Sequence, residues 1–330
     1  MAGLKLLVTG GAGFIGSNLI RFLLREEAEV EIINLDLLTY AGDLSNLKEV
    51  EGDSRHTFVH GDIGDGALVQ ELLHGVNAVL NLAAESHVDR SIRHPAPFVQ
   101  TNIVGTRVLL DAAWAAGVPR FVQVSTDEVY GELPWIDPDA GDAHGSRFSE
   151  SAPLRPRSPY SASKAAADLL ALSYHTTYGM DVVIPRGSNN YGPYQHLEKL
   201  IPLMATRAMK GESLPVFGDG LHIRDWIFVE DFCSGILSAL EKGRPGEIYN
   251  FGGNAERTNL QVVRAILGAL DMPGDLITFV PDRPGHDRRY AMDSSKARRE
   301  LGWEPRADFE AELVRTAHWY RKQLATPPFS

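Results

Sequence analysis

Cysteine is almost absent from this sequence, which has only Cys233 among its 330 residues. A single thiol cannot form a disulfide within the chain, and it excludes metal sites that need several cysteines at fixed spacing. Long apolar segments are also lacking: no run approaches the roughly 18 residues of a transmembrane helix, and no basic-then-apolar leader precedes the first predicted strand. We therefore expect a cytoplasmic protein with no membrane partner.

Positive charge is in deficit as well. The chain has 32 Lys and Arg residues against 43 Asp and Glu residues, which gives a formal net charge of -11. Nucleic acids and anionic membranes are bound by concentrated basic surfaces, so this composition excludes a general binder of either kind. An anionic ligand has to meet a few locally placed cations instead. The 44% of hydrophobic residues is enough for an extensive core, and the length favours two lobes.

A strand, a glycine turn and a helix begin the chain. Residues 4–8 form a short apolar run, and a helical pattern of apolar residues follows Gly16. Gly11, Gly13 and Gly16 fit the GxGxxG motif, while Gly10 with the last two gives an alternative three-residue spacing. Glycine permits a tight turn and close backbone approach, so a pyrophosphate can bind the N–H groups at the positive end of the helix. An ordinary surface turn is the alternative, which the flanking strand and helix disfavour.

An acid lies at the expected distance from this turn. The predicted strand 30–35 ends at Asp36, about 20 residues after Gly16, where a carboxylate binds the ribose hydroxyls of adenosine. A carboxylate there disfavours the 2'-phosphate of NADP, so we expect NAD as the cofactor. The predicted cofactor site, which includes the ends of the next two strands and two residues discussed below, consists of Gly10, Gly13, Phe14, Ile15, Gly16, Asp36, Asp62, Ile63, Ala83, Ala84, Tyr160 and Lys164.

Strands and helices alternate over the first half of the chain. Further strands are predicted at residues 56–60, 78–82, 120–124 and 181–187. Such alternation implies right-handed crossovers and an α/β fold with a Rossmann-type doubly wound parallel sheet. The alternation weakens afterwards, which predicts a smaller C-terminal α/β lobe. The predicted division is an NAD-binding domain over residues 1–187, which also receives 223–251, and a second lobe over residues 188–330.

The predicted strand 120–124 leads into the segment from Ser125 to Gly131. There, Asp127 and Glu128 place two adjacent carboxylates beside the hydroxyl of Thr126. In an open parallel sheet the ligand lies beyond the carboxyl ends of the strands, so these side chains face a bound molecule. Mutual repulsion and burial raise the pKa of one carboxyl, which leaves an acid beside a base. A solvated acidic turn or a helix cap is the alternative.

Tyr160 and Lys164 lie at the start of a helix predicted to run to about residue 178. Their spacing of four places both on one helix face, where they can act on one ligand. An ammonium near a phenol favours the phenolate, so we expect Lys164 to lower the pKa of Tyr160 and make it a base near neutral pH. The alternative is a half-buried tyrosine beside a solvated lysine. Upstream, the stretch 131–157 is rich in proline and glycine, which predicts a lid or another functional surface.

Seven motifs spread over nearly the whole chain carry a family resemblance. They are TGGAGFIG at 9–16, AAESHVDRS at 83–91, STDEVYG at 125–131, SPYSASK at 158–164, NNYGP at 189–193, RDW at 224–226 and PGHDRRY at 284–290. Together they resemble the dTDP-glucose 4,6-dehydratases of the extended short-chain dehydrogenase/reductase superfamily. The Thr-Asp-Glu segment before YxxxK is the most specific of these motifs, since related 4-epimerases and decarboxylases look different there.

The resemblance implies a reaction and a role for each of five residues. Tightly held NAD takes hydride from C4 of the hexose while Tyr160 takes the hydroxyl proton, and Thr126 hydrogen-bonds the C4 oxygen. Glu128 then removes the acidified C5 proton, and a protonated Asp127 donates to the departing C6 hydroxyl. Hydride returns to C6, which yields a 4-keto-6-deoxy sugar. The implied catalytic set is Thr126, Asp127, Glu128, Tyr160 and Lys164.

The resemblance also implies that the lobe over residues 188–330 binds a nucleotide sugar and holds its nucleoside diphosphate. Arg224 and Arg283 can fork onto pyrophosphate oxygens, and Phe217 can pack on the pyrimidine. Phe217 replaces a more usual tyrosine, which leaves selectivity between dTDP and UDP open. No metal is expected, because the His286–Asp287 pair has no companion ligand at a recognised spacing. The implied substrate set is Ser86, Asn189, Lys199, Leu200, Pro215, Phe217, Arg224, Asn259, Arg283 and His286.

Two kinds of alternative function remain. One is a UDP-sugar 4,6-dehydratase or a 4-epimerase of the same superfamily, and the Thr-Asp-Glu segment disfavours the epimerase. The other is a non-catalytic NAD-sensing protein, which the complete catalytic set disfavours. The resemblance further implies a homodimer in which helices at 98–116 and 159–178 form a bundle between subunits. The downstream pathway, to rhamnose or to a secondary-metabolite deoxysugar, stays open.

Overall fold

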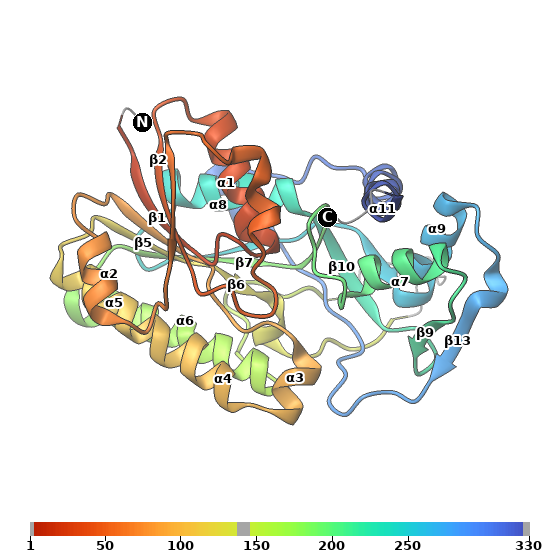
Figure 1. Ribbon diagram of the computed structural model, residues 1–330. Coiled ribbons are helices and arrows are strands. Elements are labelled where there is room, and N and C mark those ends of the chain that lie inside the picture. The colour runs from red at the N-terminus through yellow and green to blue at the C-terminus, as the bar shows by residue number, and fades with distance from the viewer. Residues whose placement is uncertain (1–2, 137–145, 326–330) are drawn as a thin grey trace.

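The computed structural model describes residues 3–136 and 146–325, and its larger lobe is built on one parallel sheet (Figure 1). The strand order is β11-β7-β5-β4-β1-β2-β3, with β6 paired to β7, and every pair in this sheet is parallel. This confirms the predicted Rossmann-type fold. The strands are β1 (Lys5–Thr9), β2 (Glu31–Asp36), β3 (His56–His60), β4 (Ala78–Asn81), β5 (Arg120–Gln123), β6 (Ser125–Thr126), β7 (Val182–Gly187) and β11 (Ile248–Phe251).

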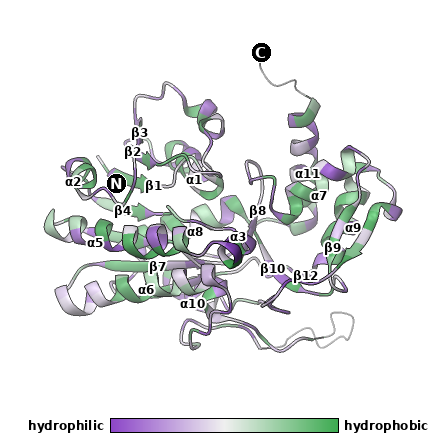
Figure 2. Ribbon diagram, turned by 60° about the horizontal axis from the view of Figure 1, so that its bottom comes forward, coloured by the Kyte–Doolittle hydropathy of each residue, from purple (hydrophilic) through white to green (hydrophobic). Residues whose placement is uncertain are grey.

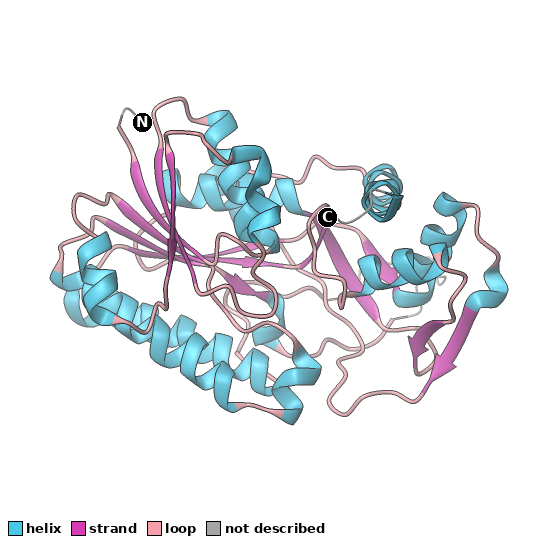
Figure 3. Ribbon diagram, viewed as in Figure 1, coloured by secondary structure: helices cyan, strands magenta, loops and turns pink. Residues whose placement is uncertain are grey.

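Helices cover both faces of this sheet, which forms the middle layer in Figure 3. One face packs against α1 (Phe14–Glu26), α8 (Val229–Lys242) and α10 (Ser295–Leu301), and the other against α2 (Gly66–Leu72), α5 (Thr106–Ala115) and α6 (Pro159–Tyr178). Strands buried on two sides need apolar residues at successive positions, which explains their continuous apolar runs. The central strands accordingly carry the hydrophobic colour in Figure 2.

The smaller lobe has its own core and short strands. Its three-stranded sheet has the order β12-β10-β8, and β9 pairs with β13 in a separate two-stranded sheet. The strands are β8 (Asn189–Tyr191), β9 (Leu214–Phe217), β10 (Ile223–Phe228), β12 (Glu256–Thr258) and β13 (Ile277–Val280). The helices are α7 (Leu200–Met209), α9 (Asn259–Leu270) and α11 (Phe309–Ala325), which share one hydrophobic cluster with these strands.

The chain passes between the lobes more than once. After the smaller lobe begins, α8 packs on the core of the larger lobe and β11 pairs with β7. A later return, which the sequence did not indicate, brings α10 and Trp303 into that same core. Of the range 223–251, β10 instead joins the three-stranded sheet of the smaller lobe.

The helical run predicted at 98–116 is not one uniform helix. It consists of α4 (Ala96–Phe98), the π-helical stretch η2 (Val99–Gly105) and α5. A π-helical turn displaces side chains from the 3.6-residue period, so the apolar pattern does not reveal it. Asn102 in η2 accepts a hydrogen bond from Glu85 N at 2.9 Å and donates to Ser163 Oγ at 2.8 Å. The irregular turn therefore links the segment after β4 to α6.

Part of the predicted loop 131–157 lies outside the described residues, namely 137–145. On either side of that gap, Leu133 N donates to Arg289 O and Phe148 N donates to Ala291 O. Both ends of the loop therefore pair with one later segment. Within residues 3–136 and 146–325, none of the helices combines the length and the hydropathy that a membrane crossing requires.

Candidate active site

The turn between β1 and α1 has space for glycine alone at two positions. A Cβ at Gly16 would lie 2.2 Å from Gly10 O, and Gly10 has φ +71 and lies against the backbone of Ala83. Gly13 precedes α1 and has no side chain that could cap the helix. The first N–H groups of the helix are thus available to an anion, and the positive end of the helix dipole favours one there. This cradle fits the pyrophosphate of NAD.

Asp36 shapes the turn and also borders the same cleft. Its Oδ2 accepts a hydrogen bond from Ala12 N at 2.8 Å, and its Oδ1 accepts one from Leu38 N at 2.8 Å. Each carboxylate oxygen has a second lone pair, so these bonds leave room for ribose hydroxyls. The carboxylate predicted to select NAD is therefore held in place by backbone groups on both sides.

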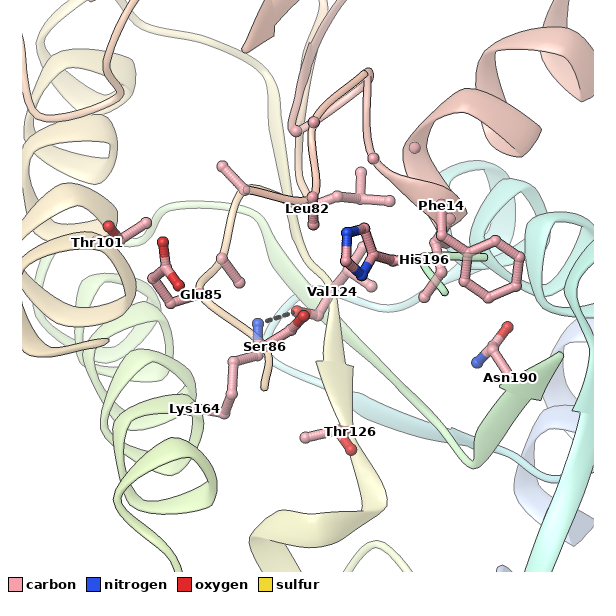
Figure 4. A pocket seen from close by; sticks show the side chains of 18 of the residues that line it. Phe14, Leu82, Glu85, Ser86, Thr101, Val124, Thr126, Lys164, Asn190 and His196 are labelled. Atoms are coloured by element: carbon pink, nitrogen blue, oxygen red, sulfur yellow. Dashed lines mark hydrogen bonds between the residues drawn. The ribbon is translucent and has the colours of Figure 1, made fainter. Parts of the chain in front are cut away.

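A cleft of about 300 Å³ runs from the glycine turn to the carboxyl ends of β5 and β7. All of the residues predicted for the cofactor and for catalysis line this one cleft. Figure 4 shows part of it, with Thr126 and Lys164 near Val124 and with Glu85 and Thr101 on the side of the π-helical stretch. The structure therefore brings together two groups of residues that lie far apart in the sequence.

The two carboxyl groups after β6 have different surroundings. Asp127 is 1% exposed, and its Oδ1 accepts a hydrogen bond from Thr126 Oγ1 at 3.2 Å. Burial, followed by Glu128 and Asp225, raises the pKa of Asp127 well above its usual range. Burial also raises the pKa of Glu128, but three nearby cations oppose that rise. The pair therefore favours a protonated Asp127 beside a carboxylate at Glu128, which is the division that acid–base chemistry needs.

Tyr160 and Lys164 share the buried face of α6, whose start is fixed by a capping box at Ser158. Lys164 Nζ donates to Val124 O at 2.7 Å (Figure 4), and burial lowers its pKa. Burial, then Glu128 and Asp127, raises the pKa of Tyr160 well above 10. The expected lowering by lysine is therefore wrong for the protein alone, because the ammonium is directed to a carbonyl while two carboxyl groups lie near the phenol.

Only some of the residues predicted for the substrate border the cleft. Ser86, Asn189 and Lys199 line it, and Lys199 Nζ donates to Ser86 O at 2.9 Å. Arg224 and Arg283 lie close enough to lower the pKa of Glu128. The residues that do not line the cleft are Leu200, Pro215, Phe217, Arg224, Asn259, Arg283 and His286.

Both arginines of this set already have partners within the protein. Arg224 donates to Ile223 O and to Asp287 O, each at 2.8 Å, while Arg283 Nη1 lies 3.2 Å from Asp89 Oδ1. An anionic ligand at Arg283 thus has to compete with a carboxylate from the larger lobe. The two lobes are held together across the cleft by contacts of this kind.

Comparisons with known proteins agree with this geometry. The family model described as GDP-mannose 4,6 dehydratase matches residues 7–316. A dTDP-glucose 4,6-dehydratase of Xanthomonas campestris pv. campestris (strain B100) is 52% identical over 335 residues, which cover 95% of this chain and 92% of the relative. The crystal structure of DesIV, a dTDP-glucose 4,6-dehydratase from Streptomyces venezuelae with NAD bound, has 49% identity and a TM-score of 0.93, and the match covers 98% of each chain. This chain belongs to the dTDP-glucose 4,6-dehydratase family.

The fold of this dehydratase family extends to epimerases. A UDP-glucose 4-epimerase from Thermotoga maritima has a TM-score of 0.87 with 30% identity, covering 97% of this chain and 100% of the epimerase. Overall shape therefore does not separate the two activities. A dehydration needs an acid and a base, and the Asp127–Glu128 pair places two carboxyl groups with different surroundings in the cleft.

Several residues line the dehydratase cleft that the sequence did not single out. Examples are Glu85, Thr101, Asn190, His196 and Glu198. Glu85 stands inside the AAESHVDRS motif, and its position just after a predicted strand could have identified it as a residue of the cleft. Thr101 lies within an apolar helical run, and His196 and Glu198 follow a three-residue strand, so no periodic pattern marks them.

His286 belongs to a cluster with His222 and Asp282 whose ligand atoms lie within 4.8 Å of one another. One carboxylate oxygen lies 2.7 Å from His286 Nδ1 and the other lies 3.1 Å from His222 Nε2. The two rings are stacked at 3.7 Å with an interplanar angle of 15°. Nitrogen lone pairs lie in the ring planes, so nearly parallel rings do not direct them at one ion. The cluster fits a carboxylate that links two imidazoles.

Proposed function

We propose that this chain converts dTDP-glucose to dTDP-4-keto-6-deoxyglucose and water, with NAD as a cofactor that is regenerated in each cycle. The proposal rests chiefly on the position of the Asp127–Glu128 pair, which lines one cleft with Thr126, Tyr160 and Lys164. Relatives of the same name that are about half identical over nearly the whole chain support it.

Oxidation at C4 is the first task of the site. NAD, when bound in this cleft, would supply a reversible hydride acceptor and, in its oxidised form, a positive charge. Tyr160 accepts the proton of the C4 hydroxyl and Thr126 donates to the C4 oxygen, while Lys164 lies one turn from Tyr160 on the same buried helix face. A nearby positive charge opposes the rise in pKa that burial and the two carboxyls impose on Tyr160. This order of events makes deprotonation of Tyr160 depend on a loaded cofactor site.

Elimination is the second task and uses the carboxyl pair. The C4 ketone acidifies C5–H, and Glu128 removes that proton. Protonated Asp127 gives its proton to the C6 hydroxyl, so the C6–O bond breaks and water leaves. Hydride then returns to C6 and a proton to C5, which leaves the cofactor oxidised and balances the reaction. The nucleotide is held by the predicted substrate set. Arg283 binds the pyrophosphate, and Lys199 does so in place of Arg224, whose guanidinium already donates to Ile223 O and Asp287 O.

Base selectivity is the main alternative within this proposal. A UDP-sugar dehydratase would share every catalytic residue, and Phe217 stands where the family more often has tyrosine. The ring of Phe217 lies 6.2 Å from that of His286, which provides an apolar and aromatic surface suited to a pyrimidine of either kind. We favour dTDP because of the relatives' activity.

A homodimer is the second part of the proposal. Exposed apolar side chains gather on the helices of one face, namely Val99, Trp114, Leu169 and Tyr178, and the rings of Trp114 and Tyr178 lie 4.7 Å apart. Exposed apolar groups of this size typically mark an interface. A monomer mass by light scattering would reject the dimer.

A cytoplasmic location also stays a prediction, with which the buried single thiol Cys233 is compatible.

The activity is tested by incubating the purified protein with dTDP-glucose and measuring the alkali-induced absorbance of a 4-keto sugar. We expect a strong signal that needs NAD on the protein and a weaker one with UDP-glucose. A galactose-configured product would indicate an epimerase. The absence of any product from either nucleotide sugar, with NAD bound, would indicate a sensor.

A further inference from the structure

Helix α6 carries a buried carboxylate in addition to Tyr160 and Lys164. Asp168 lies one turn after Lys164 and is fully buried. Residues four apart share a helix face, so its carboxylate continues the row of catalytic side chains into the core. No step of the proposed reaction uses Asp168 directly.

One oxygen of this carboxylate joins three elements. Asp168 Oδ2 accepts hydrogen bonds from Ser125 Oγ and from Arg186 Nε, both at 2.9 Å, and Arg186 Nη2 also lies 2.9 Å away. Ser125 directly precedes Thr126, and in the sheet Ser125 of β6 is the register partner of Arg186 of β7. Asp168 thus connects the catalytic helix to the strand end that carries Thr126 and the carboxyl pair.

Two buried cations depend on this carboxylate. Arg186 is 1% exposed and Lys164 is 5% exposed. A buried charge is costly unless it is paired and hydrogen-bonded. Arg186 contacts Asp168 directly and lies over the ring of Tyr130, with Cζ 4.8 Å from the centroid. Burial raises the pKa of Asp168, and both cations oppose the rise.

Asp168 also favours the ammonium form of Lys164. Burial lowers the pKa of Lys164, and the Asp168 carboxylate opposes that fall. Other titratable groups that line the same cleft as Lys164 are Tyr160 on its own helix, Glu85 after β4 and the carboxyl pair after β6. The carboxylate of Asp168 lies one turn from Lys164 on the same helix and does not take part in the proton transfers.

We propose that Asp168 is a positioning residue of the dehydratase site, which uses Ser125 and Arg186 to keep the strand end with Thr126 aligned with the helix that carries Tyr160 and Lys164. The inference rests on the proposed function. Thr126 and Tyr160 have to meet the same C4 oxygen, so a shift between their two segments separates groups that act together. An ion pair that only stabilised the fold would not need a hydrogen bond to the strand end that carries Thr126.

The test uses two variants and one matched control in the NAD-loaded protein. Ser125→Ala removes the bond to the strand end and leaves the Asp168–Arg186 pair intact. Asp168→Asn removes the charge. Thr206→Val is the control, because Thr206 is a buried hydroxyl of α7 that donates to Pro202 O at 2.8 Å in the other lobe. For each protein, kcat, KM, the thermal midpoint and the pH dependence of kcat on dTDP-glucose are measured.

We expect Ser125→Ala to lower kcat about tenfold with KM changed less than twofold, because substrate binding is retained while alignment is lost. Thr206→Val should keep kcat within about twofold at a similar loss of thermal midpoint. In Asp168→Asn the alkaline limb of the pH profile should move to lower pH, since Lys164 then loses its proton more easily. Ser125→Ala should leave that limb where the wild type has it.

Asp168→Asn leaves Arg186 unpaired in the core, and this can prevent folding. In that case Asp168→Asn combined with Arg186→Met removes both charges and takes over the pH comparison. Equal kcat values for Ser125→Ala and Thr206→Val, together with pH profiles that superimpose on the wild type, would overturn the positioning role. A wild type that forms no 4-keto product would instead overturn the proposed function, so the two failures are distinguishable.

Discussion

The two walls of the cleft are lined by different kinds of atoms. The cofactor wall is largely backbone, with Gly10 and Gly16 packed so closely that a Cβ would lie within 3 Å of neighbouring main-chain atoms. The opposite wall carries charge: Lys199 lines the cleft, and Arg283 lies behind it, close enough to lower the pKa of Glu128. These two side chains come from segments more than 80 residues apart and already bind groups of the larger lobe. A backbone wall is sensitive to added volume, whereas a wall of side chains is sensitive to charge.

Substitutions in the carboxyl pair, where the two walls meet, should have the largest effect on turnover. Asp127→Asn removes the acid and Glu128→Gln removes the base, so each variant should slow dehydration by about a hundredfold or more while NAD stays bound. Bound NAD and kcat are measured on the same preparations, with the exposed Asp275→Asn as the control for loss of one carboxylate. Unchanged turnover in both variants would show that catalysis does not reside at this junction.

Added volume in the backbone wall should weaken cofactor binding and little else. In Gly16→Ala the new Cβ meets Gly10 O at 2.2 Å, so the turn must open, and NAD affinity should fall by about tenfold or more. In Gly268→Ala, by contrast, the added Cβ meets no described atom within 4 Å, and we expect normal NAD binding. Titrations with NAD and with dTDP compare the walls directly. A loss of dTDP affinity equal to the loss for NAD would break the distinction between them.

Removal of a charge from the opposite wall should weaken binding of the substrate nucleotide and leave binding of the cofactor unchanged. Arg283→Ala should weaken dTDP binding by about tenfold, the usual consequence of losing a hydrogen bond to a charged group, and leave NAD binding unchanged. Arg264→Ala on the exposed side of α9 removes an equal charge far from the cleft and serves as the control. If both arginine variants bind dTDP like the wild type, Arg283 is not part of the substrate wall.

Loss of an exposed charge pair away from the cleft should have the smallest effect, and that effect should be on the free energy of unfolding. Arg288 lowers the pKa of Asp219 to about 2, and the Asp219 side chain is 51% exposed. A lowered pKa stabilises the folded protein above the ordinary value of 3.8, and that contribution disappears as the pH falls from 3.8 towards 2. Because the pair is screened by solvent, Asp219→Asn should cost only about 0.5 kcal/mol at neutral pH. Urea unfolding at neutral and acidic pH measures it, and a cost above about 2 kcal/mol would show that exposed pairs are not minor here.

The difference between the walls also explains what the sequence could predict. Gly10 to Gly16, Asp36 and the strands of the larger lobe other than the two-residue β6 are local patterns, so they were predicted within a residue or two of their observed ends. The smaller lobe has the strands β8, β9, β12 and β13 of three or four residues, which are too short to show a period and were not predicted.

Electrostatic properties of the cleft were the least predictable. The YxxxK spacing placed Tyr160 and Lys164 on one face, as observed, but the direction of the pKa shift of Tyr160 depends on where the ammonium points and on carboxyls from another element. The Asp168–Arg186 pair likewise joins residues of a helix and a strand, and neither residue stands in a recognised motif. Such properties arise from contacts between distant segments, which a single sequence does not specify.

The position of Cys233 has a practical consequence for measuring motion of the two lobes. Its thiol is fully buried in α8, and burial raises its pKa well above the usual range, so the reactive thiolate is suppressed. A cysteine introduced at the exposed Phe279 in the smaller lobe, or at the exposed Leu37 in the larger one, would therefore be the only site that a maleimide dye modifies in the native protein. A pair of such labels would report the distance between the lobes by energy transfer, with no need to remove the natural cysteine first.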